Sequence, residues 1–299
     1  MISLITVNYN NVKVTCELIE SLQSFDKSAF ELIVVDNASK ENASIIIKKY
    51  PWVKFIRSER NLGFAGGNNL GVTHAHGDYL FFINNDTEFK ENILFKLKGI
   101  LERDRSIGVV CPVLKYYDAP SRIQFAGFTK INRFTGRNEL ITTLSPEKIV
   151  TTSYAHGAAM MMPRYVFNQV GPMPENYFVY YEELDWSAQI STKGYQLVVD
   201  SSCELFHKES QTIGKLNEMK SYFMARNRLL FMRRNSTRIS LSLFWIYFLL
   251  VSTPKKLVSY FLAKQWKNAM AHLAGVHWNI IHSRNSQKLG YKFNTLTSL

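Results

Sequence analysis

The feature that most constrains the fold is a regular alternation of apolar runs and helical patterns in the first part of the chain. Short apolar runs recur at 2–7, 32–35, 53–57, 79–83 and 109–114. Between them, apolar residues are spaced by three or four positions, which is typical of one face of a helix. Buried strands that alternate with helices predict a mostly parallel sheet with helices on both faces.

Polar residues follow three of the predicted strands at the point where each strand ends. They are Asn8, Tyr9 and Asn10 after the first strand, Asp36 and Asn37 after the second, and Asn84, Asn85 and Asp86 after the fourth. In an open parallel sheet, ligands bind beyond the carboxyl ends of the strands. One carboxylate at such an end can simply cap a helix, but three polar ends together favour a binding site.

A glycine-rich segment at 61–69, NLGFAGGNN, lies between the third strand and the next helix. It has neither the GxGxxG spacing of a dinucleotide site nor the Lys-Ser/Thr of a P-loop. Small residues here would let the backbone approach a nucleotide closely. We expect a glycine-rich turn followed by a helix, and close helix packing is the alternative explanation of the glycines.

The alternating pattern is lost at 115–153, whose polar and turn residues fit a hairpin or a mobile loop. The pattern resumes with strands at 158–162, 196–199 and 204–206, and with a helix at 182–193.

The positive charge of the chain is concentrated in its last third. The formal charge of the whole chain is +12, and segment 208–299 holds 15 of its 36 Lys and Arg but only 2 of its 24 Asp and Glu. That segment therefore carries +13 and the rest of the chain −1. A basic segment of this kind attracts anionic surfaces, either lipid head groups or nucleic acid.

The same segment contains the most apolar run of the chain, LSLFWIYFLLV at 241–251. As a helix it would be about 16 Å long, half of a roughly 30 Å hydrocarbon core, so we expect no clear membrane span. Beyond Pro254, an apolar stripe at helical spacing opposes lysines; its members are Leu262, Trp266, Ala269, Leu273, Val276 and Ile280. This pattern favours a helix in a membrane interface, and a buried core helix is the alternative for the apolar run.

Eight short motifs stand in an order that resembles family 2 glycosyltransferases, specifically the bacterial rhamnosyltransferase-like branch. They are VNYN, VVDNAS, NLGFAGGNN, FFINNDTEF, HGAAMM, YFVYYEELDW, HKES and Arg226-Asn227-Arg228, and they cover about residues 2–235. The resemblance implies an α/β GT-A-type nucleotide-diphospho-sugar transferase fold at 1–210, with a nucleotide-sugar half at 1–114 and an acceptor half at 115–210. A basic, amphipathic, membrane-associated helical extension would follow at 211–299.

The resemblance further implies that the protein transfers a sugar from a nucleotide-diphosphate donor with inversion. Asp36 matches the carboxylate that contacts the base or ribose of the donor. Asn61 and Asn69 match the asparagines of the donor-binding loop, and Asn8 and Asn85 are expected to bind the donor with them.

The metal-binding site of the family also has counterparts here. Asp86 matches the last acid of the DxD-type motif, whose first acid is replaced by Asn84 in this chain. His207 matches a histidine that ligates the metal or contacts the diphosphate. Mg²⁺ or Mn²⁺ is the expected ion, with water and phosphate oxygens completing its shell.

The catalytic base is expected at Glu183, which occupies the position of the family's acceptor-deprotonating Asp. Glu is one methylene longer than Asp but can still act as a base. Three acids at the start of a helix have an alternative explanation, since they complement the helix dipole. Glu182, Asp185 and Trp186 are expected on the acceptor side, although Trp186 could equally be a core aromatic.

These inferences predict an enzyme in the cytoplasm, at the inner face of the cell membrane. Its donor would be a dTDP- or UDP-linked sugar, and its acceptor a growing surface polysaccharide or lipid-linked glycan, with no nucleic-acid partner. One alternative is a glycosyltransferase with a soluble or protein acceptor, whose basic segment mediates dimerisation. Another is a non-catalytic protein that binds a nucleotide sugar or nucleic acid.

Overall fold

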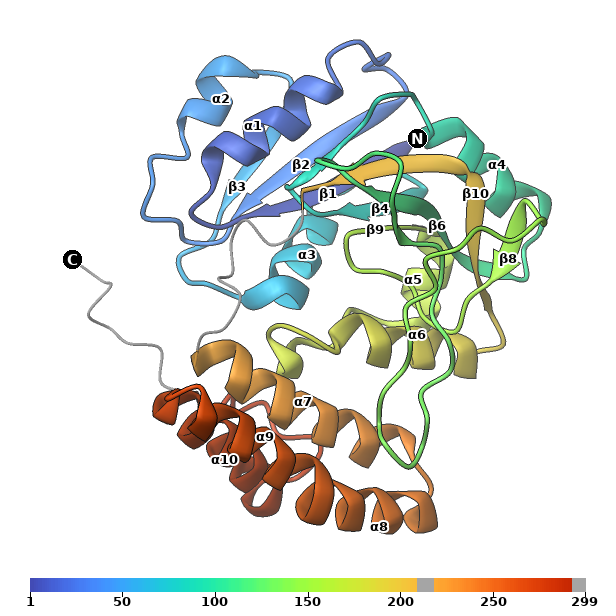
Figure 1. The fold of residues 1–299 in the computed structure, drawn as a ribbon. Coiled ribbons are helices and arrows are strands. Elements are labelled where there is room, and N and C mark those ends of the chain that lie inside the picture. The colour runs from blue at the N-terminus through green and yellow to red at the C-terminus, as the bar shows by residue number, and fades with distance from the viewer. Residues whose placement is uncertain (209–217, 292–299) are drawn as a thin grey trace. The chain divides into compact units, whose positions relative to one another are not determined.

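The protein divides into two units in a computed structural model that describes residues 1–208 and 218–291 (Figure 1). The sheet unit comprises Met1–Lys130, Asn138–Glu175 and Glu182–Ile213. The helical unit comprises Ile131–Arg137, Asn176–Tyr181 and Gly214–Leu299. Each unit has its own cluster of buried apolar side chains.

The sheet unit is built on strands in the order β3-β2-β1-β4-β9-β6-β10-β5, with β7 beside β6 and β8 beside β10. Their bounds are β1 Ile2–Asn8, β2 Phe30–Asp36, β3 Lys54–Arg57, β4 Tyr79–Ile83, β5 Thr87–Glu88, β6 Ile107–Tyr116, β7 Ile123–Phe125, β8 Ile149–Thr151, β9 Ala159–Pro163 and β10 Gln196–His207. Strands β3, β2, β1 and β4 are mutually parallel, as are β6 and β10, whereas β9 runs antiparallel to β4 and β6. The predicted, mostly parallel sheet is confirmed.

Helices cover both faces of this sheet, as predicted (Figure 1). On one face lie α1 Val12–Ser21, α2 Ile45–Lys49 and α4 Leu94–Arg103, and on the other α3 Gly63–Thr73, α5 Arg164–Val170 and α6 Glu182–Thr192. Because both faces are covered, nearly every residue of β1, β2 and β4 is buried. A single 3₁₀ turn, Glu175–Tyr177, precedes α6.

The glycine-rich segment is helical, which corrects the expected turn. Helix α3 begins at Gly63 and contains most of the segment. A Cβ on Gly67 would lie 2.9 Å from the Val7 methyl groups, and a Cβ on Gly71 would overlap the Ile5 side chain. The glycines therefore let α3 pack closely on β1, which is the alternative explanation considered from the sequence.

In the second half of the sheet, one expectation needs correction and another is confirmed. The predicted strands at 196–199 and 204–206 form the single strand β10, whose register on β6 shifts between Asp200 and Glu204. The hairpin expected in the irregular region 115–153 is confirmed, since β7 pairs antiparallel with the nearby end of β6 and Phe128 bridges antiparallel to Leu140. Strand β8 was not predicted, because it forms by pairing with the distant strand β10, which local periodicity does not report.

The helical unit consists of α7 Glu218–Asn235, α8 Arg238–Tyr247, a π-helical turn Phe248–Ser252, α9 Thr253–Leu262 and α10 Trp266–Ile281. The basic helix predicted at 215–234 corresponds to α7, and its first three residues lie outside the described part of the chain. Helices α7 and α10 pack closely, since a Cβ on Gly275 would lie 2.5 Å from the Tyr222 carbonyl oxygen.

The helical run continues past Pro254. Pro254 is in the first turn of α9, where a backbone N–H is not needed for the hydrogen bonds of the helix. The proline therefore does not interrupt the succession of α8, the π-helical turn and α9. Among the described residues, Arg238–Leu262 is one stretch of 25 residues that could cross a membrane by length and composition alone. The short apolar run did not indicate a stretch of this length.

The predicted stripe does not lie on one helix, because Leu262 is the last residue of α9 and Lys264, with a left-handed φ of 56°, separates it from α10. The members of the stripe on α10 are in turn split between two environments. Ala269 and Val276 are buried, whereas Trp266, Leu273 and Ile280 are exposed together with Met270 and Ile281. The α10 helix therefore has a packed face and a separate exposed apolar face.

Candidate active site

The polar ends of three parallel strands are joined by a chain of hydrogen bonds. Asn8 Nδ2 donates to Asp36 Oδ1 over 2.8 Å, and Thr15 Oγ1 donates to Asn8 Oδ1 over 2.8 Å. Asn85 Nδ2 donates in turn to Thr15 Oγ1 over 2.9 Å. The structure thus brings together three of the predicted donor-binding residues, through a threonine of α1 that the sequence analysis did not identify.

Asp36 is fully buried and both of its carboxylate oxygens have partners. Arg57 Nη1 lies 3.1 Å from Asp36 Oδ2, and the Ser39 backbone N–H donates to the same oxygen. The chain turns sharply beside it, since Asn10 and Ala38 adopt left-handed φ values of 50° and 61°. Strained backbone of this kind is found often at functional sites.

The two asparagines predicted for the donor loop have different surroundings. Asn61 Oδ1 accepts hydrogen bonds from the Gly63 N–H and from Asn37 Nδ2, so it shapes the entry into α3. Asn69 bonds both the N–H and the C=O of Met173, and its Nδ2 also donates to Glu175. Asn69 thus holds the 173–175 segment against α3, whereas Asn61 lies just before the first residue of that helix.

Asp86 and His207 form a buried pair because β5 runs antiparallel to the end of β10. His207 Nε2 lies 3.1 Å from Asp86 Oδ1, and each side chain is 8% exposed. Neither atom has a hydrogen-bond partner among the residues that the structure describes. On the other side of the ring, His207 Nδ1 lies 2.8 Å from Gln124 Oε1.

This pair fits a divalent cation. A buried polar atom without a partner costs free energy, and two such atoms that face each other can be satisfied together by one ion. The set is small, because the described residues contain no group of three or more His, Cys, Asp or Glu that could hold a metal. Water and phosphate oxygens of a ligand would have to supply the remaining positions.

His156 lies next to this pair, although the sequence analysis left it out of the site. Its ring is 6.2 Å from the His207 ring and stacks on Phe128 at 5.7 Å. Burial, and then the nearby His207, lower the pKa of His156 to about 3, so its ring is neutral at physiological pH. The HGAAMM motif was the signal that could have placed it here.

Glu183 stands in the first turn of α6 and keeps partial access to solvent. The side chain lies close to Gly157, the residue that follows His156. A Cβ added to Gly157 would be 3.8 Å from Glu183 Cγ. Burial raises the pKa of Glu183 to about 7, well above the ordinary value of 4.5. A carboxyl group with this pKa can accept a proton near neutral pH.

The other residues predicted on the acceptor side are more deeply buried than Glu183. Glu182 is 3% exposed and Asp185 1%, and Asp185 Oδ2 accepts from Gln189 Nε2. The Trp186 ring is 1% exposed and packs edge-to-face on Phe82 at 5.5 Å. The packing of Trp186 favours the core aromatic, which was the alternative to a sugar-stacking role.

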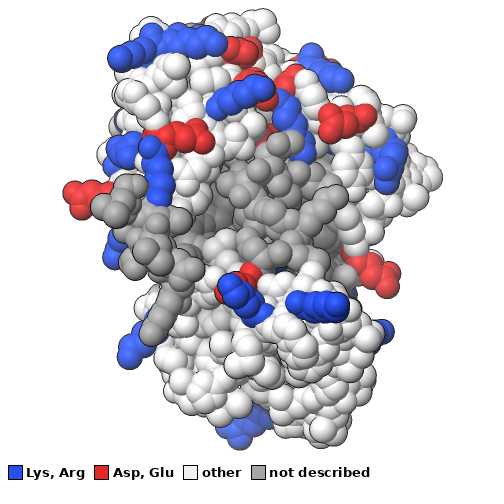
Figure 2. All heavy atoms as spheres, turned by 60° about the vertical axis from the view of Figure 1, so that its left-hand side comes forward, with Lys and Arg blue, Asp and Glu red and all other residues white. Residues whose placement is uncertain are grey.

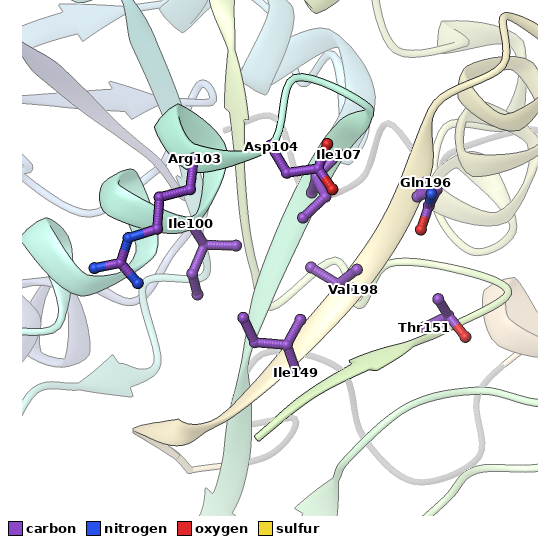
Figure 3. A pocket seen from close by; sticks show the side chains of 8 residues that line it. All are labelled: Ile100, Arg103, Asp104, Ile107, Ile149, Thr151, Gln196 and Val198. Atoms are coloured by element: carbon purple, nitrogen blue, oxygen red, sulfur yellow. The ribbon is translucent and has the colours of Figure 1, made fainter. Parts of the chain in front are cut away.

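Two cavities of the sheet unit are poor candidates for a diphosphate site, one because of its position and the other because of its charge. One of about 270 Å³ lies where β6 and β10 begin, at Ile107 and Gln196, opposite the strand ends described above (Figure 3). Another of about 590 Å³ is lined by Glu17, Glu20, Glu88, Asp118 and Lys208 among others. Lys208 is already paired with Glu17 and Glu88, so the excess of acidic groups disfavours a diphosphate there.

Known proteins share both the sequence pattern and the fold. An uncharacterized glycosyltransferase of Haemophilus influenzae is 29% identical over 173 residues, which cover 57% of this chain and 55% of that relative. The match thus spans little more than half the length of this relative. The dTDP-rhamnosyl transferase RfbF of Shigella flexneri is 21% identical over 262 residues, covering 82% of this chain and 86% of that relative.

A mannosyltransferase from Pyrobaculum calidifontis, solved in complex with GDP-Man and Mn²⁺, has a similar structure. The TM-score is 0.58 at 14% identity, and the match covers 94% of this chain and 87% of that one. This likeness confirms the predicted GT-A-type fold. A family model described as glycosyl transferase family 2 matches residues 3–171, more than half of the chain. The chain therefore belongs to glycosyl transferase family 2.

Proposed function

We propose that the protein is an inverting glycosyltransferase that acts on a nucleotide-diphosphate sugar. The donor would be a dTDP- or UDP-linked hexose such as rhamnose, and the acceptor a hydroxyl group of a growing surface polysaccharide or lipid-linked glycan. The observation that carries this proposal is the buried Asp86–His207 pair, which lies at the strand ends together with the bonded chain from Asp36 to Asn85.

Glu183 would act as the general base. It takes the proton of the acceptor hydroxyl while that oxygen forms a bond to the anomeric carbon of the donor. The bond between this carbon and the diphosphate oxygen breaks on the opposite side, so configuration inverts and the nucleoside diphosphate leaves. Its pKa of about 7 supports this role, because a base is most effective when its pKa is near the working pH.

Asp86 and His207 would hold Mg²⁺ or Mn²⁺, which supplies positive charge where the leaving diphosphate becomes more negative. Asn8, Asp36, Asn61 and Asn85 would bind and orient the rest of the donor. Asn69 would contribute by holding the 173–175 segment against α3.

We also propose that the helical unit contacts a membrane surface, at the inner face of the cell membrane. Exposed apolar side chains recur at helical spacing along α8 and the π-helical turn that follows it, at Ile239, Leu243, Ile246 and Leu250. Only 16 uncharged residues separate Arg238 from Lys255, a length of about 24 Å that is shorter than a roughly 30 Å hydrocarbon core. Phe244 and Phe248 are buried on the opposite side of the helix, which supports a helix lying in the interface rather than across it.

The enzymatic part of the proposal is tested by Glu183→Gln. Release of nucleoside diphosphate from dTDP- and UDP-sugars would be measured with Mn²⁺, and donor binding by thermal shift. The variant should lose about 10²–10⁴-fold in turnover, the usual contribution of a general base, while donor binding is retained.

Glu91→Gln is the matched control, since Glu91 is exposed and its ion pair within residues 1–208 and 218–291 is with Lys96. Unchanged turnover in Glu183→Gln would refute the assignment of the base. Binding of nucleotide sugars without any turnover by the wild-type protein, whatever acceptor is offered, would favour the non-catalytic binding protein instead.

A further inference from the structure

The side chain of Gln124 reaches the histidine of the Asp86–His207 pair from the opposite side. Strand β7 pairs with the end of β6, where Leu114 faces Phe125 and Lys115 faces Ile123. Strand β10 pairs with the same end of β6, where Tyr116 faces His207. These two pairings bring Gln124, which is 5% exposed, to the ring of His207.

The two nitrogens of the His207 ring thus have different neighbours. Nδ1 lies 2.8 Å from Gln124 Oε1, and Nε2 lies 3.1 Å from Asp86 Oδ1. An amide oxygen can only accept a hydrogen bond, so Nδ1 must carry the hydrogen of this contact. A neutral imidazole has one N–H, and Nε2 is then left with its lone pair.

This tautomer explains why the short contact between His207 and Asp86 is not a hydrogen bond. Nε2 and Oδ1 would both be acceptors, and neither has a partner elsewhere among the described residues. In this neutral form, two acceptors at 3.1 Å repel each other unless a cation or a second ring proton lies between them. The reverse orientation of the amide would place the hydrogen on Nε2 and close that atom to a cation.

We propose that Gln124 is a positioning residue that fixes the His207 tautomer and thereby prepares Nε2, with Asp86, for a divalent cation. This inference rests on the proposed function, since it concerns the metal pair of that site. Histidines that bind metals usually donate their second N–H to an outer partner, which orients the ring. Here the outer partner is a neutral amide on a strand of the acceptor half.

The tautomer can be read directly in the metal-free protein. Long-range ¹H–¹⁵N spectra of histidine-labelled protein would be recorded, with the His207 signal assigned through His207→Gln. The wild type should show His207 protonated at Nδ1. Gln124→Glu, whose carboxylate also accepts, should keep this tautomer, whereas Gln124→Leu and the more isosteric Gln124→Met should shift His207 toward the Nε2–H form.

Mn²⁺ affinity, measured by titration calorimetry without substrate, is the second readout. Loss of an outer-shell partner should weaken Mn²⁺ binding by about 10–100-fold in Gln124→Leu and Gln124→Met, with a much smaller change in Gln124→Glu. Gln196→Leu is the control, because Gln196 lies at the other end of β10 and its side chain donates a hydrogen bond to Ser106 Oγ. Circular dichroism would establish that each variant is folded.

The outcomes separate this inference from the proposed function. A wild-type His207 protonated at Nε2, or a tautomer that does not change in folded Gln124→Leu or Gln124→Met, overturns the role of Gln124. The expected tautomer together with no Mn²⁺ binding by the wild type overturns the proposed metal site, while Gln124 still fixes the ring.

Discussion

Side chains of the candidate site differ in how many of their polar atoms have hydrogen-bond or ion-pair partners within the protein. The oxygens of Asp36 are occupied by Asn8, Arg57 and the Ser39 N–H, so this carboxylate is rigidly held. The facing atoms of Asp86 and His207 have no such partners in the described part of the chain. Buried polar groups are normally satisfied, so these two facing atoms support the proposed cation site.

The raised pKa of Glu183 predicts a pH dependence of the reaction. With Glu183 as the proposed base, its carboxyl group must be ionised to take a proton, so the transfer rate should increase as pH rises through about 7 and become constant above it. Steady-state rates from pH 5.5 to 8.5 at saturating donor would show this limb. A rate that is already constant between pH 5.5 and 7 would contradict the assigned pKa.

Stability should respond to pH in the opposite direction. The folded-state pKa of Glu183, about 7, is above the ordinary value of 4.5, so ionisation is unfavourable in the fold and stability is lost as pH rises between these values. Glu183→Gln mimics the protonated form. It should be more stable than the wild type at pH 8 by on the order of 1–3 kcal/mol, with little difference near pH 4.5.

Urea unfolding of both proteins at pH 8 and pH 4.5 measures this difference. An equal gain in stability at both pH values would show that the substitution acts through packing and not through charge.

Among the helices and strands, local sequence patterns predicted those elements whose formation depends on residues close together in the chain. The alternation of apolar runs predicted β1 to β4 and the helices between them, because a strand buried on both faces must be apolar along its length. The motif resemblance identified Asp86 and His207. Gln124 and Thr15 were missed because their contacts join residues 83 and 70 positions apart, and no local pattern records such pairing.

The triplet at 226–228 shows the same limit. From the sequence, its arginines could reach phosphates or lie on a solvated face, yet both are buried in the helical unit. Asn227 Nδ2 donates to the carbonyl oxygens of Tyr177, Val179 and Tyr180, in a segment where several residues adopt left-handed φ values. The triplet is thus explained by tertiary structure within that unit.

Helix α3 allows a matched test of the close packing inferred from its glycines. Gly71→Ala would place a methyl group against Ile5, and overpacking of a core usually costs about 1–3 kcal/mol. Gly99→Ala in α4 meets nothing within 4 Å and should stabilise the protein by about 0.5–1 kcal/mol through helix propensity. Chemical unfolding measures both changes, and a stabilising Gly71→Ala would show that α3 packs less closely on β1.

At the scale of the whole molecule, charge and apolar surface are unevenly distributed along the chain. The excess of positive charge lies in 208–299, and the exposed apolar side chains of α8, α9 and α10 belong to the same segment. In Figure 2, where white marks every residue other than Lys, Arg, Asp and Glu, broad white stretches with scattered blue side chains lie at the height of α7–α10 in Figure 1. Large apolar surface combined with basic residues is typical of proteins that bind anionic membranes.

Vesicle flotation tests this membrane contact against dimerisation of the same surface. The wild type should float with vesicles that contain anionic lipid. Leu243→Glu with Leu250→Glu should abolish flotation by placing charge in the apolar stripe, and Lys255→Glu with Lys256→Glu should weaken it, since each basic residue near the surface contributes about 1 kcal/mol. Ile47→Glu with Phe95→Glu is the matched control, because both residues are exposed apolar positions of the sheet unit.

Flotation that is unaffected by the α8 pair, or reduced equally by the control pair, would contradict membrane contact through this face. A wild type that does not float but sediments as a dimer, and becomes monomeric in Leu243→Glu with Leu250→Glu, would assign the same stripe to a second copy of the chain. The two results are exclusive in their physical cause: apolar surface on α8 is removed from water either by lipid or by protein, and only lipid binding should also depend on the anionic lipid content.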